Sequence, residues 1–125
     1  MSKFFHSFIS ALSILILISC SDSKQELAKA FSDWDTDPNA CIGIRSELAG
    51  ELIEKKDLIL DLNENQVLEI FGRPDKTKLL KRSQKEFIYF IESSPECENN
   101  SARSKYLWIR IAAISNVSEV LILEE

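Results

Sequence analysis

The chain has 125 residues, 45% of them hydrophobic, and a formal net charge of −5, a composition typical of one small globular domain. The acidic balance argues against nucleic acid as a partner, because binding to phosphates requires an excess of lysine and arginine. The only histidine, His6, lies in an apolar N-terminal segment. The remainder of the chain therefore cannot supply Ser-His-Asp or Cys-His catalysis, or a histidine-ligated zinc site.

The N-terminal segment has the features of an export signal. Lys3 supplies positive charge, and residues 8–18 form an apolar run that is short for a membrane span, which needs roughly 20 residues. The end of this run, Leu17-Ile18-Ser19-Cys20, resembles the lipobox of bacterial lipoproteins. In that family the cysteine sulfur receives a diacylglycerol and the chain is cut before it. An ordinary secretory signal, or a simple N-terminal anchor, is the alternative.

The lipobox resemblance implies an organisation for the whole chain. We expect residues 1–19 to be a signal peptide, residues 20–23 to be a lipidated cysteine with a short tether, and residues 24–125 to form a single domain. Ser21 follows the cysteine in place of an aspartate, which in enterobacterial-type sorting is typical of the outer membrane. The expected location is the cell envelope, with the lipid on Cys20 as the membrane contact. Removal of Lys3 leaves fourteen basic and twenty acidic residues, a net charge of −6.

The cysteine count then predicts a disulfide. With Cys20 acylated, Cys41 and Cys97 are the two that remain, and an exported pair normally oxidises. They lie 56 positions apart, so a bridge would contribute roughly 4 kcal/mol in the chain-entropy model. Two buried free thiols are the alternative.

Two helices are predicted before residue 57. Ser23 and Glu26 have the spacing of a capping box. The helix that follows presents one apolar face, formed by Leu27, Ala30, Phe31 and Trp34. A longer helix is predicted over residues 38–56, because Asp37 is a suitable cap and proline fits the first turn. Its expected core-facing residues are Cys41, Ile44, Leu48 and Leu52.

The clearest local signal is the helix that begins after Leu62. Asn63 and Gln66 form a second capping box, Leu62 and Val67 occupy the positions of a hydrophobic staple, and Gly72 ends the helix.

Beyond this helix the hydrophobic period changes to that of strands. Strands are predicted over residues 84–92, 105–113 and 117–123, with a polar loop between the first two. Short returns favour antiparallel pairing. The predicted fold class is α+β, with the N-terminal helices packed on a three-stranded antiparallel meander in two layers.

The order of these elements resembles the small outer-membrane lipoproteins of the SmpA/OmlA (BamE-like) group. The resemblance is carried by residues 63–75, with their central valine and the Gly-x-Pro stop after the helix, and by the aromatic pair Tyr89-Phe90 in the following strand. It covers roughly Asp61 to Glu125. It implies a helix-plus-sheet fold and a role as an accessory subunit in outer-membrane assembly or integrity.

Two polar features before the first predicted strand are candidate ligand sites. Asp33, Asp35 and Asp37 alternate like the start of a calcium loop. Pro38 and Ile44 then occupy positions that need glycine and a bidentate glutamate, so no metal site is predicted. Arg45 lies just off the apolar face of its helix, where it can pair with an acidic neighbour or, alternatively, bind a ligand.

A basic run interrupts the acidic chain after Gly72. It consists of Arg73, Lys76, Lys78, Lys81, Arg82 and Lys85. A solvated edge or loop is the favoured interpretation, since lysines protect sheet edges from unwanted pairing. The alternative is a contact surface for anionic headgroups or for an acidic partner protein.

Three aromatic residues of the predicted strands are further candidates for partner binding. Tyr89, Tyr106 and Trp108 are expected to share one face of the sheet. Core packing is the favoured interpretation, and a partner site on an uncovered face is the alternative.

These observations favour a binding protein over an enzyme. No pattern supplies a general base or nucleophile, so we expect neither catalysis nor a cofactor. The predicted function is a non-catalytic, protein-binding accessory module of the cell envelope. The alternative is a proteinaceous inhibitor of a secreted or periplasmic hydrolase, since similar helix-plus-sheet modules occur in such inhibitors.

Overall fold

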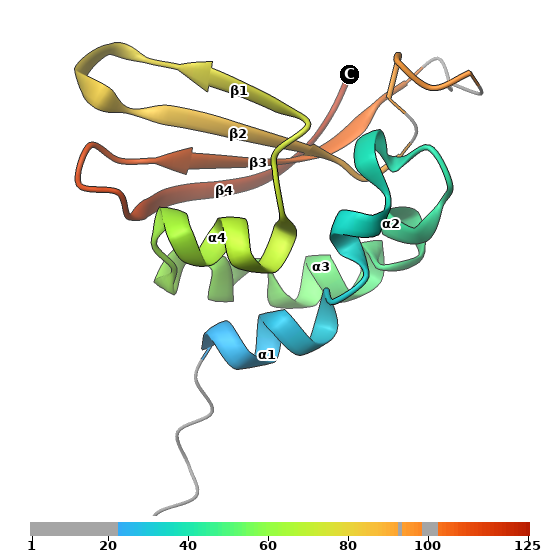
Figure 1. Ribbon diagram of the computed structural model, residues 1–125, viewed down its shortest axis with the longest axis horizontal. Helices are drawn as coiled ribbons and strands as arrows, with labels where there is room; N and C mark the ends of the chain where they lie inside the picture. Colours follow the sequence, from blue (N-terminus) through green and yellow to red (C-terminus); the bar gives the residue numbers. More distant parts are fainter. Residues whose placement is uncertain (1–22, 93, 99–102) are drawn as a thin grey trace, which may run out of the picture.

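The computed structural model describes residues 23–92, 94–98 and 103–125. The predicted signal peptide and the predicted lipidation site Cys20 lie outside these residues. The described part has an α+β fold, as predicted, in which helices pack against one face of an antiparallel sheet (Figure 1). The sheet has four strands where three were predicted.

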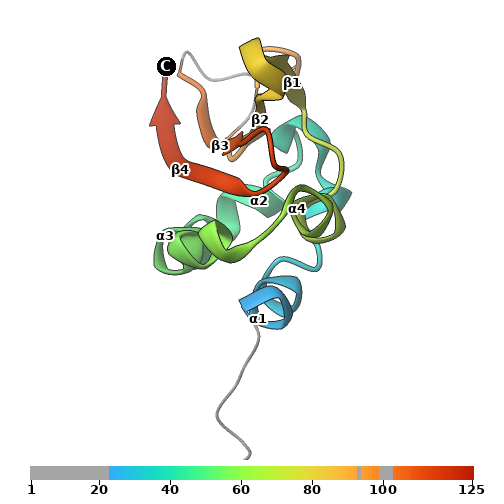
Figure 2. The same ribbon diagram turned by 90° about the vertical axis from the view of Figure 1, so that its left-hand side faces the viewer.

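The helical half precedes the sheet in the chain. Its elements are α1 (Ser23–Ala30), η1 (Trp34–Thr36), η2 (Pro38–Ala40), α2 (Ile44–Glu47), α3 (Ala49–Lys55), η3 (Lys56–Asp61) and α4 (Glu64–Phe71). Both views place α3 and α4 between the sheet and α1 (Figure 1, Figure 2), and η3, which follows α3, lies against β4. The predicted two-layer arrangement therefore describes α3, α4 and the sheet, and α1 is added underneath.

The long helix predicted over residues 38–56 is wrong, because the chain bends several times within that range. Asn39 and Ala40 have φ angles of 59° and 56°, and Gly43 has a φ of 86°, all in the left-handed region that ends a right-handed helix. The short helices α2 and α3 replace the predicted one. As a result Cys41, expected to face the core, is exposed, while Arg45 is only 1% exposed.

Helix α4 has both predicted ends. The Asn63 side chain accepts a hydrogen bond from the Gln66 main chain at 2.9 Å, and the Gln66 side chain accepts one from the Asn63 main chain at 3.0 Å. The staple residues Leu62 and Val67 are both buried. The helix ends at Gly72, whose φ of 74° suits glycine. This geometry delivers the chain directly into the sheet.

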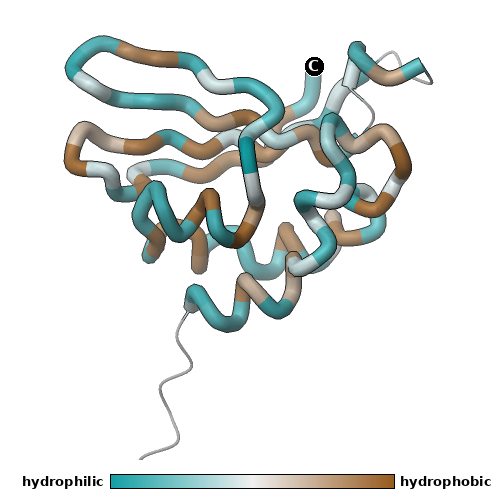
Figure 3. The backbone as a smooth tube through the Cα atoms, viewed as in Figure 1, coloured by the Kyte–Doolittle hydropathy of each residue, from teal (hydrophilic) through white to brown (hydrophobic). Residues whose placement is uncertain are grey.

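The sheet is a meander in which each strand pairs with the next. Its strands are β1 (Lys76–Leu79), β2 (Lys85–Phe90), β3 (Lys105–Ile111) and β4 (Val117–Glu124), all antiparallel. The three predicted strands correspond to β2, β3 and β4. Strand β1 was missed because its sequence, Lys-Thr-Lys-Leu, has no alternating apolar side; all of its residues are exposed. Figure 3 shows β1 as mostly hydrophilic, with a hydrophobic stretch toward the turn that leads into the neighbouring strand β2.

The core lies between the helices and the inner face of the sheet. An aromatic cluster joins the two halves: Phe31 contacts Trp34 and Phe71, and Phe71 contacts Tyr89, with ring centroids 5.3–5.8 Å apart. Leu27 and Phe31 are fully buried. The segment that begins with α1 is therefore part of the domain, and burial of each such side chain contributes about 1.5–3 kcal/mol.

The predicted disulfide is present. Cys41 and Cys97 are joined by an S–S bond of 2.00 Å, with their Cα atoms 5.4 Å apart. The bond links the turn before α2 to the loop between β2 and β3. Two distant parts of the chain are thus tied together at one end of the sheet.

Candidate protein-binding surface

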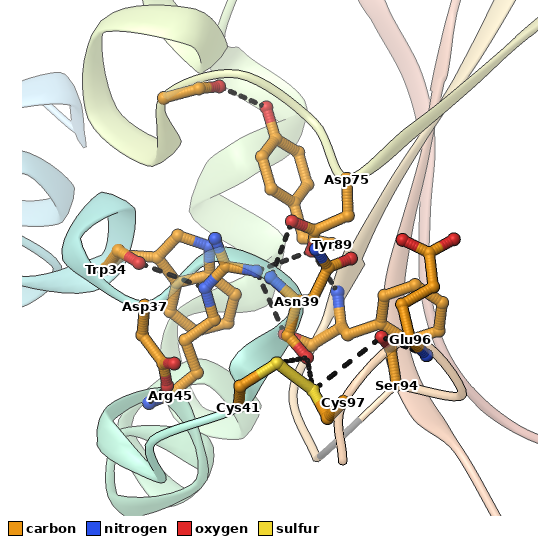
Figure 4. A network of polar contacts seen from close by, with 12 residues as sticks. Trp34, Asp37, Asn39, Cys41, Arg45, Asp75, Tyr89, Ser94, Glu96 and Cys97 are labelled. Atoms are coloured by element: carbon orange, nitrogen blue, oxygen red, sulfur yellow. Dashed lines mark hydrogen bonds and ion pairs between the residues drawn. A yellow bond between two sulfur atoms is a disulfide. The ribbon is translucent and has the colours of Figure 1, made fainter. Parts of the chain in front are cut away.

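A buried ion pair positions the start of β1 (Figure 4). The Arg45 guanidinium donates to the Asp75 carboxylate at 2.6 Å and to the Trp34 carbonyl at 2.9 Å, and it lies 5.0 Å from the centre of the Trp34 ring. The side chains of Arg45 and Asp75 are 1% and 4% exposed. Arg45 thus pairs with an acidic residue, and its Nε and Nη1 groups donate inside the protein.

The Asp75 and Asp37 carboxylates accept further hydrogen bonds in this cluster. The Asp75 carboxylate also accepts from the main chains of Asn39 at 2.9 Å and Phe90 at 2.8 Å. Asp37 accepts from the main chains of Ile42 at 2.9 Å and Arg45 at 3.1 Å. Sequence analysis missed Asp75 because its partners are distant along the chain. The cluster holds the turn before α2 against β1 and β2, so it supports the sheet from the side opposite its outer face.

No helix of the described part of the chain covers the outer face of the sheet (Figure 1, Figure 2). The strand register arranges its side chains in three rows that run across the sheet. The first row is Lys76, Ile88, Trp108 and Leu121. The second row is Lys78, Glu86, Arg110 and Glu119. The third row is Phe90, Tyr106 and Leu123. We call this surface the open face.

Most apolar side chains of the open face are partly exposed to solvent, although Phe90 is only 4% exposed. Trp108 and Tyr106 are half-buried, and Leu121 is 36% exposed. The rings of Phe90 and Tyr106 meet edge to face, with centroids 6.2 Å apart. Partial burial raises the pKa of the Tyr106 hydroxyl, and the nearby Glu125 carboxylate adds to the effect. Aromatic and aliphatic side chains in this setting are well suited to contact a partner protein.

The positive and negative charges of the second row of the open face compensate one another. Its members alternate in sign across the strands, and the Arg110 guanidinium lies 3.9 Å from Glu86 and 4.0 Å from Glu119. Arg110 also lies 5.3 Å from the centre of the Trp108 ring. Cross-strand pairs of opposite charge stabilise the sheet and leave little net field over this row. The open face therefore combines apolar rows with a nearly neutral polar one.

The prediction that Tyr89 shares a face with Tyr106 and Trp108 is wrong. In the register Tyr89 pairs with Leu107 on the inner face, where it is fully buried. Its hydroxyl donates to the Gly72 carbonyl at 2.8 Å, and burial raises its pKa. Tyr89 is thus a core residue that cannot touch a partner, while Tyr106 and Trp108 lie together on the open face.

The basic run does not form one patch. Lys78, with Lys76, lies on the open face, while Lys81 and Arg82 lie in the turn between β1 and β2. Lys85 is on the inner face, paired with Glu64. Arg73 lines an open groove of about 590 Å³ beside the start of β1, together with Asp35, Asn39, Arg45, Asp75 and Thr77. The favoured prediction of a solvated edge describes β1 well.

Among the described residues, no three His, Cys, Asp or Glu side chains are grouped so as to hold a metal ion. No helix in that part of the chain is long and apolar enough to cross a membrane. Comparison with models of known protein families, with curated proteins and with solved structures finds no match to this chain.

Proposed function

We propose that this protein is a non-catalytic, protein-binding module of the bacterial cell envelope, held at the outer membrane by a lipid on Cys20. The observation that carries the proposal is the open face, where Trp108 and Tyr106 are half-buried and Leu121 is 36% exposed, while helices bury the opposite side of the sheet. Exposed aromatic residues next to aliphatic ones are the usual anchors of protein interfaces.

The position of α1 supports this arrangement. Ser23, the first residue of α1, is three positions after Cys20, so an anchored domain would stand directly on the membrane surface. Helix α1 lies on the opposite side of the molecule from the sheet (Figure 1, Figure 2). An anchor at Cys20 would therefore direct the open face away from the bilayer. Two or more acyl chains hold a protein stably, since each buried methylene contributes roughly 0.8 kcal/mol.

The anchor has a direct test. Cells that produce the protein are labelled with palmitate, and the protein and its Cys20→Ala variant are compared in membrane fractions. We expect label in the membrane-bound protein and neither label nor membrane association in the variant. An unlabelled protein that fractionates like its variant would overturn the proposed anchor.

The contact surface is tested by site-specific photo-crosslinking in intact cells. A photoreactive residue is placed at Trp108 or Tyr106 on the open face, or at Ile53, which is 55% exposed on α3, as the matched control. We expect discrete protein adducts from the two open-face positions and none from the control. Adducts from all three positions alike, or from none, would contradict the proposed surface.

The identity of the adduct decides between the more specific functions. A subunit of an outer-membrane assembly complex would support the accessory role that the BamE-like resemblance implies. A secreted or periplasmic hydrolase, inhibited in proportion to binding, would instead favour the inhibitor.

A further inference from the structure

Strand β1 is at the edge of the sheet, and no strand among the described residues pairs with its outer side. The sheet order is β1-β2-β3-β4, and all residues of β1 are exposed. The Leu80 N–H donates to the Gln84 carbonyl at 2.8 Å, which makes these residues a hydrogen-bonded pair. Such pairs alternate along an antiparallel ladder, so the main-chain groups of Lys78 also face β2. The main-chain groups of Thr77 and Leu79 therefore point away from β2, where a further strand could pair with them.

The side chains of β1 select the kind of strand that fits. Lys76 and Lys78 lie two residues apart on the open face. In the described part of the chain neither forms an ion pair. The Lys76 ammonium lies 5.5 Å from the centre of the Phe90 ring, and Glu86, the register neighbour of Lys78, lies 3.9 Å from Arg110. A second copy of β1 would bring lysine opposite lysine, and like charges directly opposite each other destabilise a sheet. A strand with carboxylates at the same spacing would meet opposite charges.

The surroundings of β1 add to this preference. Lys81 and Arg82 extend the positive charge beyond one end of the strand, and Arg73 precedes the other end. The groove beside Thr77 lies on the inner-face side of the same edge and leaves space for the side chain between the two carboxylates. The headgroups of the anchoring membrane are a poorer occupant, because the sheet lies on the side of the molecule away from α1 (Figure 2).

We propose that β1 receives an extended acidic segment of a partner protein as a fifth strand, with two carboxylates, two residues apart, opposite Lys76 and Lys78. This inference rests on the proposed protein-binding function and names the chemistry of its partner. Main-chain hydrogen bonds supply affinity in such strand addition, and the alternating side chains supply selectivity.

The test uses the full-length protein in detergent micelles and an acetylated, amidated peptide in which glutamate alternates with valine and threonine. Amide hydrogen exchange is followed residue by residue. We expect the peptide to slow exchange at Thr77 and Leu79 by about tenfold, the effect of one added hydrogen bond each, with little change at Lys76 and Lys78. Unchanged exchange at Thr77 and Leu79 with saturating peptide would overturn strand addition.

Two controls separate strand pairing from charge attraction alone. A peptide of the same sequence, N-methylated at the amides that would face β1, keeps its charge but cannot donate, and we expect it to bind at least about tenfold more weakly. The variant Lys76→Glu/Lys78→Glu should no longer bind the acidic peptide and should instead bind a peptide with lysine in place of glutamate. Equal binding of methylated and unmethylated peptides, or binding to anionic vesicles without amide protection, would indicate a charged surface and contradict the proposal.

The outcome can be told apart from a failure of the proposed function. If the peptide does not bind while crosslinks from Trp108 persist, the strand addition is wrong and the protein-binding role stands. If both are absent, both proposals fail.

Discussion

The Arg45 guanidinium donates a 2.6 Å hydrogen bond to the Asp75 carboxylate, and both side chains are almost fully withdrawn from water. Breaking a buried pair of this kind is costly, because the remaining charge has no compensation. We expect Arg45→Met or Asp75→Asn alone to lower the free energy of unfolding by about 3–5 kcal/mol, measured by chemical denaturation.

The double variant Arg45→Met/Asp75→Asn is the control for this prediction. Because it leaves no uncompensated charge, its loss of stability should be clearly smaller than the sum of the two single losses. A strictly additive result would show that the two side chains do not act as a pair.

Gly72 and Gly50 form a matched pair for a second prediction. A Cβ at Gly72 would lie 2.6 Å from the Asp35 Cβ, at a φ of 74° that disfavours other residues. We expect Gly72→Ala to destabilise the protein by about 1–3 kcal/mol. Gly50 in α3 has nothing within 4 Å of such a Cβ, so Gly50→Ala should stabilise by about 0.5–1 kcal/mol. Thermal or denaturant unfolding measures the change in stability of each variant. Changes of the same sign in both variants would contradict this account.

The disulfide leads to a third prediction. Cys41–Cys97 closes a long loop of the unfolded chain, so reduction should remove roughly 4 kcal/mol of stability. Denaturant unfolding with and without a thiol reductant measures the difference. The Cys41→Ser/Cys97→Ser variant should have the same stability as the reduced protein, and reductant should not change it. A change of its stability on reduction would mean that the reductant acts on some other group.

The buried Tyr89 hydroxyl predicts how stability depends on alkaline pH. Burial raises its pKa above the ordinary value of 10.0, so the folded state keeps the proton that the unfolded state releases. The resulting stability is fully present below pH 10.0 and is lost as the pH rises from there toward the folded pKa. Tyr89→Phe should cost about 1 kcal/mol at neutral pH, because the Gly72 carbonyl loses its donor.

The measurement is the free energy of unfolding between neutral and alkaline pH. Wild type and Tyr89→Phe should converge as the pH rises, while Tyr106→Phe, at a half-buried position, should change the curve less. The chain has two tyrosines, so tyrosinate absorbance reports on them alone. Parallel curves for wild type and Tyr89→Phe would show that this hydroxyl does not control the alkaline transition.

Much of the fold could be predicted from short-range patterns. Both ends of α4 follow from residues within one or two turns of each other, such as Asn63 with Gln66. The strands β2, β3 and β4 follow from their aromatic and β-branched composition. The disulfide follows from the small number of cysteines in a chain whose N-terminal segment predicts export.

The features that could not be predicted depend on contacts between distant residues. Strand β1 exists because β2 provides a partner for an otherwise polar segment, and Arg45 is buried because Asp75 meets it from thirty positions away. The face occupied by Tyr89 was ambiguous, since both sides of β2 are rich in apolar residues: Phe87 and Tyr89 on one, Ile88 and Phe90 on the other. Only the helices covering one side decide which set is internal.

The stacking of α1, then α3 and α4, then the sheet determines how far the open face would lie from a membrane at the start of α1 (Figure 2). Neighbouring elements pack about 10 Å apart, so a domain tethered at the start of α1 would carry its open face on the order of 20 Å above the lipid. A partner pressed flat against the bilayer would be out of reach. The helices would hold the open face above the membrane, at a height that suits partners extending away from the bilayer.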